Sequence, residues 1–265
     1  MEPPSPQIAR MLWSLLPYLP LGLLAGLLSG LLGIGGGLVF APMLLLAGLE
    51  PHQALATSTL AIVPTTLGST WTHLANRSLP WRSALAIAIG AGLGAGLFSR
   101  VSLGLQGWQL LALQALMYAV LTATIQPHGP PDDGVESPPN LPGLSAVGWM
   151  AGLATGMLGI GGGLVMVPLM VRFLRVPIHL AIRFSGLAVL VSATVASTTF
   201  LRDGRALLPV GLALGATAAL AARWSAARLD RVSGVYLVWM LRALTMVLGL
   251  QSGGHALQLL LGPTG

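Results

Sequence analysis

Two clusters of consecutive glycines are the residues of this sequence best suited to bind a ligand. Gly35, Gly36 and Gly37 interrupt one long apolar run, and Gly161, Gly162 and Gly163 interrupt another. Consecutive glycines destabilise a helix, and in lipid an unwound backbone persists only where protein or a water-filled cavity satisfies it. A helix that restarts after such a break directs free N–H groups and partial positive charge into the cavity. The breaks therefore predict the walls of an interior anion site.

The glycines that precede each break have a simpler interpretation. They follow the small-xxx-small spacing that lets two helices pack closely, at Gly26, Gly30, Gly33, Gly152, Gly156 and Gly159. Close packing is the favoured explanation for these six. It is also the alternative for the triple glycines, although packing rarely needs three glycines in a row.

Hydroxyl side chains follow each break within an otherwise apolar run. Thr57, Ser58 and Thr59 follow the first break, and Ser185 follows the second. A hydroxyl can donate to an oxyanion without the desolvation cost of a full charge. The alternative is that each hydroxyl bonds its own backbone or joins two helices. We expect these residues to line the site because they recur at matched positions near the breaks.

Arg183 is a charged residue inside an apolar run. No carboxylate lies in any apolar run, so we expect an unpaired guanidinium suited to an anion with several oxygens. The alternative is an arginine near a helix end that reaches the membrane interface. Arg242 has the same two interpretations, and Gln114 is its counterpart in the first half; both are secondary candidates.

The distribution of acidic residues argues for an anionic substrate. Every acid falls in a tail or a predicted loop: Glu2, Glu50, Asp132, Asp133, Glu136, Asp203 and Asp230. A cation site or a carboxylate proton relay therefore has no ligands inside the apolar runs.

Proton coupling, if present, would have to use histidine. His52, His179 and His73 are the conventional candidates, and the first two are secondary candidates for the site. Each lies near the end of an apolar run, so an interfacial position is the alternative interpretation.

The elements that hold these residues are transmembrane helices. The chain has 265 residues, of which 54% are hydrophobic and 8% charged. Eight apolar runs approach or exceed the roughly 20 residues that one membrane-spanning helix needs. The sequence therefore predicts an all-α polytopic membrane protein with the lipid bilayer as its surroundings.

The chain contains two similar halves. The segment GLLSGLLGIGGGLV from Gly26 matches GLATGMLGIGGGLV from Gly152 at 11 of 14 positions, and each is followed by a proline at the same distance. We predict a polar tail at 1–10, a first repeat at 11–125, a Pro-rich acidic linker at 126–142 and a second repeat at 143–265.

The course of the Gly-broken segments at the start of each repeat has two solutions. If they span the membrane, the repeats are parallel; if they are re-entrant, the repeats are inverted. The re-entrant course places Arg77, Arg82, Arg172, Arg175, Arg223, Arg228 and Arg231 on one side, and Arg10, Arg100, Arg202 and Arg205 on the other. This asymmetry mildly favours the re-entrant course, because cytoplasmic loops are enriched in arginine.

Several classes of function are excluded by what the sequence lacks. All 13 basic residues are scattered arginines, which is not a surface for nucleic acid. There is no cysteine, phosphate-binding loop or hydrolase motif, so neither an enzyme nor an ATP-driven pump is expected, and no cofactor or metal is implied.

The paired motif G-x-x-x-G-x-x-G-I-G-G-G-x-x-x-x-P resembles the TauE/SafE sulfite exporter family, also called the toluenesulfonate uptake permease family. The resemblance covers residues 20–250 and implies a seven- or eight-helix protein of the bacterial inner membrane. It further implies transport of sulfite, sulfoacetate or other organosulfonates. Carried over by position, the motif residues are Gly33, Gly35–Gly37, Pro42, Ser58, Gly159, Gly161–Gly163, Pro168 and Ser185. Arg183 departs from the family, in which small or hydroxyl residues are more usual there.

The hypothesis favoured by the sequence is a secondary exporter of small sulfur-containing anions with one site between the repeats. The alternatives are an importer of a different small anion and a non-transporting membrane scaffold or accessory subunit. The sequence predicts neither a coupling ion nor an oligomeric state.

Overall fold

The computed structural model of the chain describes residues 18–75, 80–124 and 140–261, and its regular elements there are all helical. The first half contains α2 (Tyr18–Leu32), α3 (Gly37–Leu46), α4 (Pro51–Ala75), α5 (Trp81–Leu103) and α6 (Gly107–Thr124). The second half contains α7 (Leu141–Leu158), α8 (Gly163–Phe173), α9 (Ile178–Arg202), α10 (Leu208–Ala226), the short 3-10 helix η1 (Leu229–Arg231) and α11 (Gly234–Leu261). The all-helical prediction is confirmed. The predicted tail at 1–10 and most of the predicted linker lie outside the described residues.

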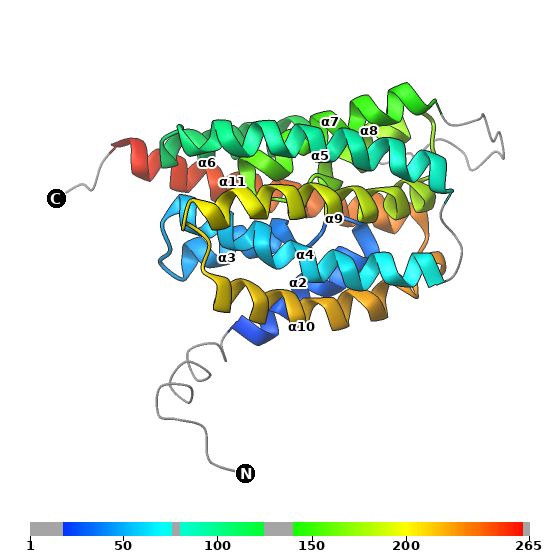
Figure 1. Ribbon diagram of the computed structural model, residues 1–265, viewed down its shortest axis with the longest axis horizontal. Coiled ribbons are helices and arrows are strands. Elements are labelled where there is room, and N and C mark those ends of the chain that lie inside the picture. The colour runs from blue at the N-terminus through cyan, green and yellow to red at the C-terminus, as the bar shows by residue number, and fades with distance from the viewer. Residues whose placement is uncertain (1–17, 76–79, 125–139, 262–265) are drawn as a thin grey trace, which may run out of the picture.

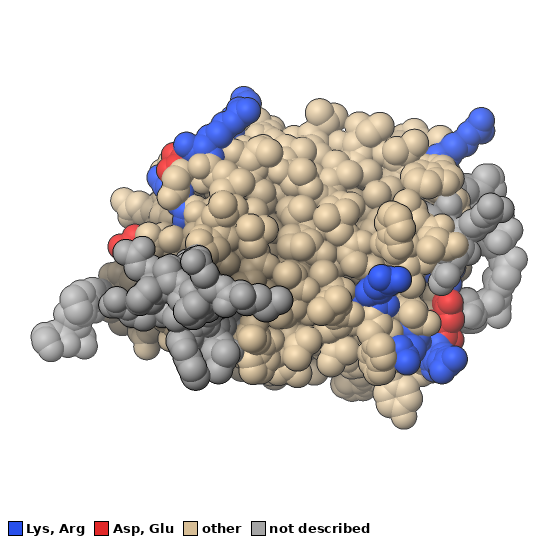
Figure 2. Space-filling model, turned by 60° about the horizontal axis from the view of Figure 1, so that its bottom comes forward, with Lys and Arg blue, Asp and Glu red and all other residues tan. Residues whose placement is uncertain are grey.

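The surface has the character of a membrane protein. Within the described ranges, α5, α7, α9 and α11 are long and apolar enough to cross a bilayer. Large apolar side chains face outward, including Leu93, Leu220 and Leu250, which are 67%, 72% and 72% exposed. Figure 2 shows the charged side chains gathered toward the two ends of the molecule, with an uncharged band between them.

The last helix is longer than its apolar run. The run 235–250 ends where polar residues begin, yet α11 continues to Leu261. Ser252 is buried within this extension. The polar residues that follow the apolar run therefore belong to the same continuous helix.

The connections between helices lie at two opposite ends of the molecule (Figure 1). We call the end that carries residues 46–51, 103–107 and 202–208 the first end, and the end that carries residues 173–178 and 226–234 the second end. Helices α4 and α10 both begin at the first end, where the amide of Leu207 donates to the Thr57 hydroxyl at 3.0 Å. Helix α9 runs the opposite way, from the second end to the first.

Each half begins with a hairpin whose turn is the glycine break. Helix α2 runs parallel to α10, since Gly22 faces Thr217 and Gly30 faces Ser225. Helix α3 returns toward the first end, where Ala41 packs with Leu55. In the second half Gly143, near the start of α7, faces Leu174 at the end of α8. Each broken segment is therefore a helical hairpin that returns to the end where it begins, and the two hairpins begin at opposite ends (Figure 1).

The two halves are interleaved. Helix α5 of the first half packs against α7 and α9 of the second, and α10 of the second half packs against α2 and α4 of the first. Helices α6 and α11 pack against each other. Neither half therefore contains all the neighbours of its own helices.

The glycines that precede each break serve this interleaving. A Cβ atom on Gly26 would lie 2.2 Å from the Ala218 carbonyl oxygen of α10. One on Gly152 would lie 2.6 Å from the Ala91 carbonyl oxygen of α5. Gly30 and Gly156 meet the backbones of the same two helices, so the predicted packing role of these glycines is confirmed.

Candidate functional site

The two glycine breaks contact each other through their backbones. A Cβ on Gly163 would lie 2.0 Å from the carbonyl oxygen of Gly33, and one on Gly37 would lie 2.9 Å from that of Gly159. The two breaks therefore cross antiparallel, with the end of each against the start of the other. Such an approach leaves no room for any side chain, which explains glycine at Gly37 and Gly163.

Backbone conformation gives a second reason for glycine. Gly33, Gly35 and Gly36 have φ values of 66°, 78° and 80°, in the left-handed region that other residues rarely adopt. Gly159 and Gly161 have φ values of 63° and 75°. These turns reverse the chain between α2 and α3 and between α7 and α8.

Two matched serines join each break to the other half. Ser58 on α4 donates to the carbonyl of Gly159 at 2.8 Å, and Ser185 on α9 donates to the carbonyl of Gly33 at 2.9 Å. Both serines are fully buried. A buried carbonyl that lost its donor would be costly, so these bonds fix where the breaks meet.

The second break is completed by hydroxyl groups that the sequence interpretation did not single out. Thr155 on α7 accepts a hydrogen bond from the amide of Gly162 at 2.6 Å. Ser192 on α9 donates to the same Thr155 hydroxyl at 3.2 Å. The amide at the start of α8 is thus capped by a two-hydroxyl chain.

The first break lacks this chain. Ser29 is the counterpart of Thr155, with a 1% exposed side chain whose hydroxyl has no hydrogen-bond partner among the described residues. The counterpart of Ser192 is Thr65, which donates to Ala61 of its own helix at 2.8 Å. In the part of the chain that the structure describes, the amide of Gly36 donates to no acceptor.

The other two predicted hydroxyl residues, Thr57 and Thr59, form hydrogen bonds with backbone groups. Thr57 accepts from Leu207 at the first end, and Thr59 donates to Leu55 of its own helix at 2.8 Å. Of the predicted hydroxyl residues, Ser58 and Ser185 therefore bond the breaks directly, whereas Thr57 and Thr59 do not.

Arg183 has a partner, which corrects the expectation of an unpaired guanidinium. Its Nη2 lies 2.5 Å from Oδ1 of Asp230 in η1, at the second end. Asp230 was placed correctly in a loop, but that loop folds back over the start of α9. The Nε atom of Arg183 is buried and has no hydrogen-bond partner within the described ranges.

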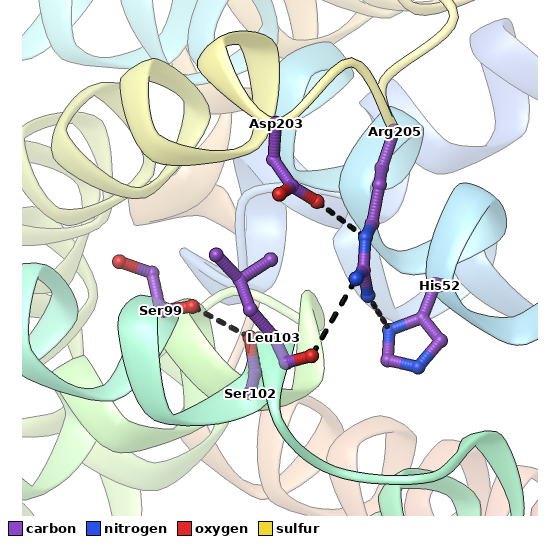
Figure 3. Close-up of polar contacts among 6 residues, drawn as sticks. All are labelled: His52, Ser99, Ser102, Leu103, Asp203 and Arg205. Carbon is purple, nitrogen blue, oxygen red and sulfur yellow. Dashed lines mark hydrogen bonds and ion pairs between the residues drawn. The ribbon is translucent and has the colours of Figure 1, made fainter.

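A second arginine cluster lies at the first end (Figure 3). Arg205 forms an ion pair with Asp203, and its Nη1 lies 2.8 Å from Nδ1 of His52. The same guanidinium donates to the carbonyl of Leu103 at 3.5 Å. The cluster connects the α9–α10 turn to the start of α4 and the end of α5, which belong to the other half.

The secondary candidates lie away from the breaks. His179 contacts the carbonyl of Val232 at 3.0 Å at the second end. Gln114 is fully buried on α6, where its Nε2 donates to the Tyr118 hydroxyl at 3.0 Å. Arg242 lies over the Trp239 ring at 5.8 Å, a partly exposed position that suits an interfacial arginine. None of the three has a polar contact with a break among the described residues.

A shallow groove lies at the second end, between the ends of α4 and α10. Its volume is about 430 Å³, and Trp71, Arg223, Trp224 and Arg228 line it. Arg228 lies over the Trp224 ring at 3.7 Å. Aromatic and arginine side chains of this kind are typical of a membrane interface. Among the described residues no three His, Asp or Glu side chains gather closely enough to hold a metal ion.

The sequence held a signal for the residues that were missed. Ser29 and Thr155 occupy the fourth position of the two 14-residue motifs, so a hydroxyl is present in both copies. Asp230 and Asp203 carried no comparable signal, because their partners depend on how distant helices pack.

Comparison with known proteins identifies a matching family and several relatives. The family described as "Sulfite exporter TauE/SafE" matches residues 18–252. A probable membrane transporter protein of Xylella fastidiosa (strain 9a5c) is 30% identical over 251 residues, which cover 85% of this chain and 95% of that protein. The probable membrane transporter protein YunE of Bacillus subtilis (strain 168) is 26% identical over 257 residues, covering 87% of this chain and 94% of that protein.

A shorter match is found in a plant protein. The "Sulfite exporter TauE/SafE family protein 3" of Arabidopsis thaliana is 42% identical over 48 residues, which cover 18% of this chain and 10% of that protein. The two bacterial relatives, by contrast, are similar to this chain over nearly their whole lengths.

Proposed function

This chain belongs to the TauE/SafE sulfite exporter family and is a membrane transporter, and on that premise we propose that it exports a small sulfur-containing anion such as sulfite or an organosulfonate. The proposed site lies where the two glycine breaks meet. The proposed location is the bacterial inner membrane, with transport of the secondary type.

The observation that carries this proposal is the antiparallel contact of the two breaks. Gly163 meets Gly33, and Gly37 meets Gly159, at the point where α3 and α8 begin. The N-terminus of a helix carries partial positive charge and unpaired amides, which favour an anion. Discontinuous helices at corresponding places of two repeats are a known arrangement for transporter sites.

The charge distribution supports an anion over a cation. The described acids are Glu50, Asp203 and Asp230, and all three lie at the ends of the molecule. The acceptors near the breaks are backbone carbonyls, of which Gly33 and Gly159 already accept hydrogen bonds from serine. A cation in the interior would therefore find no carboxylate ligand among the described residues.

The opposite orientation of the two hairpins is compatible with an alternating-access mechanism. Because the two broken segments enter from opposite ends, a site between them can open toward either end by movement of one hairpin against the other. The Arg183–Asp230 and Arg205–Asp203–His52 clusters lie at the second and first ends respectively. Each would have to rearrange when its end opens.

The distribution of arginines supports a proposal for which end of the molecule faces the cytoplasm. Arg82, Arg172, Arg175, Arg223, Arg228 and Arg231 lie at the second end, whereas Arg100, Arg202 and Arg205 lie at the first. By the positive-inside rule, we propose that the second end faces the cytoplasm. For an exporter, Arg183 would meet the anion on entry, since its buried Nε has no partner among the described residues.

The proposal is tested by flux into proteoliposomes of known orientation. We expect saturable movement of sulfite or sulfoacetate, and no movement of sodium or potassium. Arg183→Gln should reduce the flux, whereas Asp230→Asn, at a side chain that is 70% exposed, should leave most of it. Absence of flux for every sulfur oxyanion and sulfonate would reject the proposed function, and inward transport alone would reject its direction.

A further inference from the structure

The two breaks share the sequence Gly-Ile-Gly-Gly-Gly but differ in how their polar groups are satisfied. We propose that the first break is the ligand-binding half of the site, in which the hydroxyl of Ser29 and the amide of Gly36 bind oxygens of the transported anion. The second break is then a structural support, closed by its own hydroxyl chain. This inference rests on the proposed function and assigns the donors within that site.

The hydroxyl of Ser29 is the first of the two proposed donors. Its side chain is 1% exposed and its hydroxyl has no partner in the structure. Burying an unpaired hydroxyl costs free energy, so a natural protein that retains one is expected to use it. The position is defined by its counterpart, because the Thr155 hydroxyl contacts the amide of Gly162 at 2.6 Å. Ser29 therefore stands where a hydroxyl can reach the first break.

The amide of Gly36, at the start of α3, is the second proposed donor. Gly36 precedes this ten-residue helix with φ 80°, and its amide has no acceptor among the described residues. The first amides of a helix also lack partners within the helix. An uncapped amide and an unpaired hydroxyl, at the positions that correspond to Gly162 and Thr155, would offer two neutral donors to an oxyanion.

The second break differs at each of these points. Gly162 has φ −63°, and its amide donates to Thr155, which in turn accepts from Ser192. The Gly162 amide and the Thr155 hydroxyl, the counterparts of the two groups at the first break, are thus already hydrogen-bonded within the protein. A ligand that bound these two groups would have to displace internal hydrogen bonds, whereas Ser29 and the Gly36 amide have no such bonds among the described residues.

The donor set favours an oxyanion with at least two oxygens on one centre. Both donors are neutral, so they stabilise a charged acceptor without holding it as tightly as an ion pair would. Sulfite and the sulfonate head group each carry several oxygens on one sulfur, so the two donors could bind different oxygens of one anion. Weak, neutral binding also suits a transporter that must release its substrate.

The matched variants Ser29→Ala and Thr155→Ala test the proposal in the full-length protein. Sulfite flux would be measured in proteoliposomes to obtain KM, and melting temperature would be measured in detergent with and without sulfite. We expect Ser29→Ala to raise KM about tenfold, because a hydrogen bond to a charged group is lost. Its melting temperature without sulfite should stay the same or rise, since an unpaired buried hydroxyl is removed.

Thr155→Ala should show the opposite pattern. Its melting temperature without sulfite should fall, because the amide of Gly162 and the hydroxyl of Ser192 both lose a partner. Its KM should stay within about twofold of the wild-type value, less than the effect expected for a lost ligand hydrogen bond.

The outcomes distinguish a failure of the assignment of the first break from a failure of the proposed transport function. Normal sulfite flux in Ser29→Ala with an unchanged KM would overturn the assignment of the first break and leave the transport function standing. An equal rise of KM in Thr155→Ala would also overturn it, because both breaks would then bind. If the wild-type protein moved no sulfur oxyanion or sulfonate, the proposed function would fail and this assignment with it.

Discussion

The first and second glycine breaks have the same five residues and nearly the same flanks, yet one is closed by side chains and the other is open. Thr155 and Ser192 cap the amide of Gly162, whereas Ser29 and the amide of Gly36 have no partner among the described residues. A repeated motif therefore preserves the path of the backbone without preserving its hydrogen bonds.

The two breaks also differ in the hydroxyl residue that the neighbouring helix, α4 or α9, contributes. Thr65, the counterpart of Ser192, donates to the carbonyl of Ala61 four residues earlier on its own helix. A β-branched hydroxyl in a helix is readily held in this way. Ser192 bonds its own helix at 3.2 Å and also reaches Thr155. The Ser192 hydroxyl therefore extends the hydrogen-bond chain at the second break, and the Thr65 hydroxyl does not do so at the first.

The largest effect is expected from side chains added where the breaks touch. Gly163→Ala would place a Cβ 2.0 Å from the Gly33 carbonyl oxygen, and backbone cannot move aside as a side chain can. We expect a loss of about 3 kcal/mol or more in stability, at the upper end of overpacking effects. Gly37→Ala should cost less, since its closest clash, at 2.4 Å, is with the movable end of Ile62.

Melting temperature in detergent would measure both substitutions at the breaks. Gly254→Ala is the matched control, because nothing lies within 4 Å of a Cβ at that site on α11. An equal loss for Gly37→Ala and Gly163→Ala would show that the two breaks are packed alike.

An intermediate effect is expected from the serines that join each break to the other half. Ser58→Ala and Ser185→Ala should each lower stability by about 1–2 kcal/mol, because each leaves a buried carbonyl without its donor. Ser58→Ala should cost more, since Ser58 also lies 3.3 Å from the carbonyl of Gly37 and so bonds both breaks. Chemical unfolding of the two variants would measure the difference. A larger loss for Ser185→Ala would contradict this ranking.

The smallest effect is expected at the hydroxyls that distinguish the breaks. Ser192→Ala removes the donor to Thr155 and should cost about 1 kcal/mol, the value of a typical internal hydrogen bond. Thr65→Ala removes only a bond within its own helix and should cost clearly less. Melting temperatures that differ in the opposite order would mean that Thr155 does not depend on Ser192.

Much of the framework could be predicted from the sequence. The helical membrane class follows from apolar runs, and the packing of Gly26 and Gly152 follows from their spacing. Ser58 and Ser185 were found because they recur at matched positions, and the structure places both on the breaks. Periodic and repeated features are visible in a sequence because they are local.

The partners of individual polar groups could not be predicted in the same way. Arg183 was expected to be unpaired because Asp230 lies 47 residues away and outside any apolar run. The difference between the breaks depends on one φ angle, at Gly36 or Gly162, and on which acceptor a hydroxyl selects. These choices are made by tertiary packing after the helices have formed.

The interleaving of the halves also has a consequence for how the protein is made. The glycine face of α2 packs against α10, and the Ser225 hydroxyl that meets the carbonyl of Gly26 lies 199 residues further along the chain. During synthesis the first hairpin therefore enters the membrane long before its neighbour exists. An element that is inserted early thus gains its neighbour late, so truncation anywhere before α10 would leave α2 without the helix against which its glycines pack.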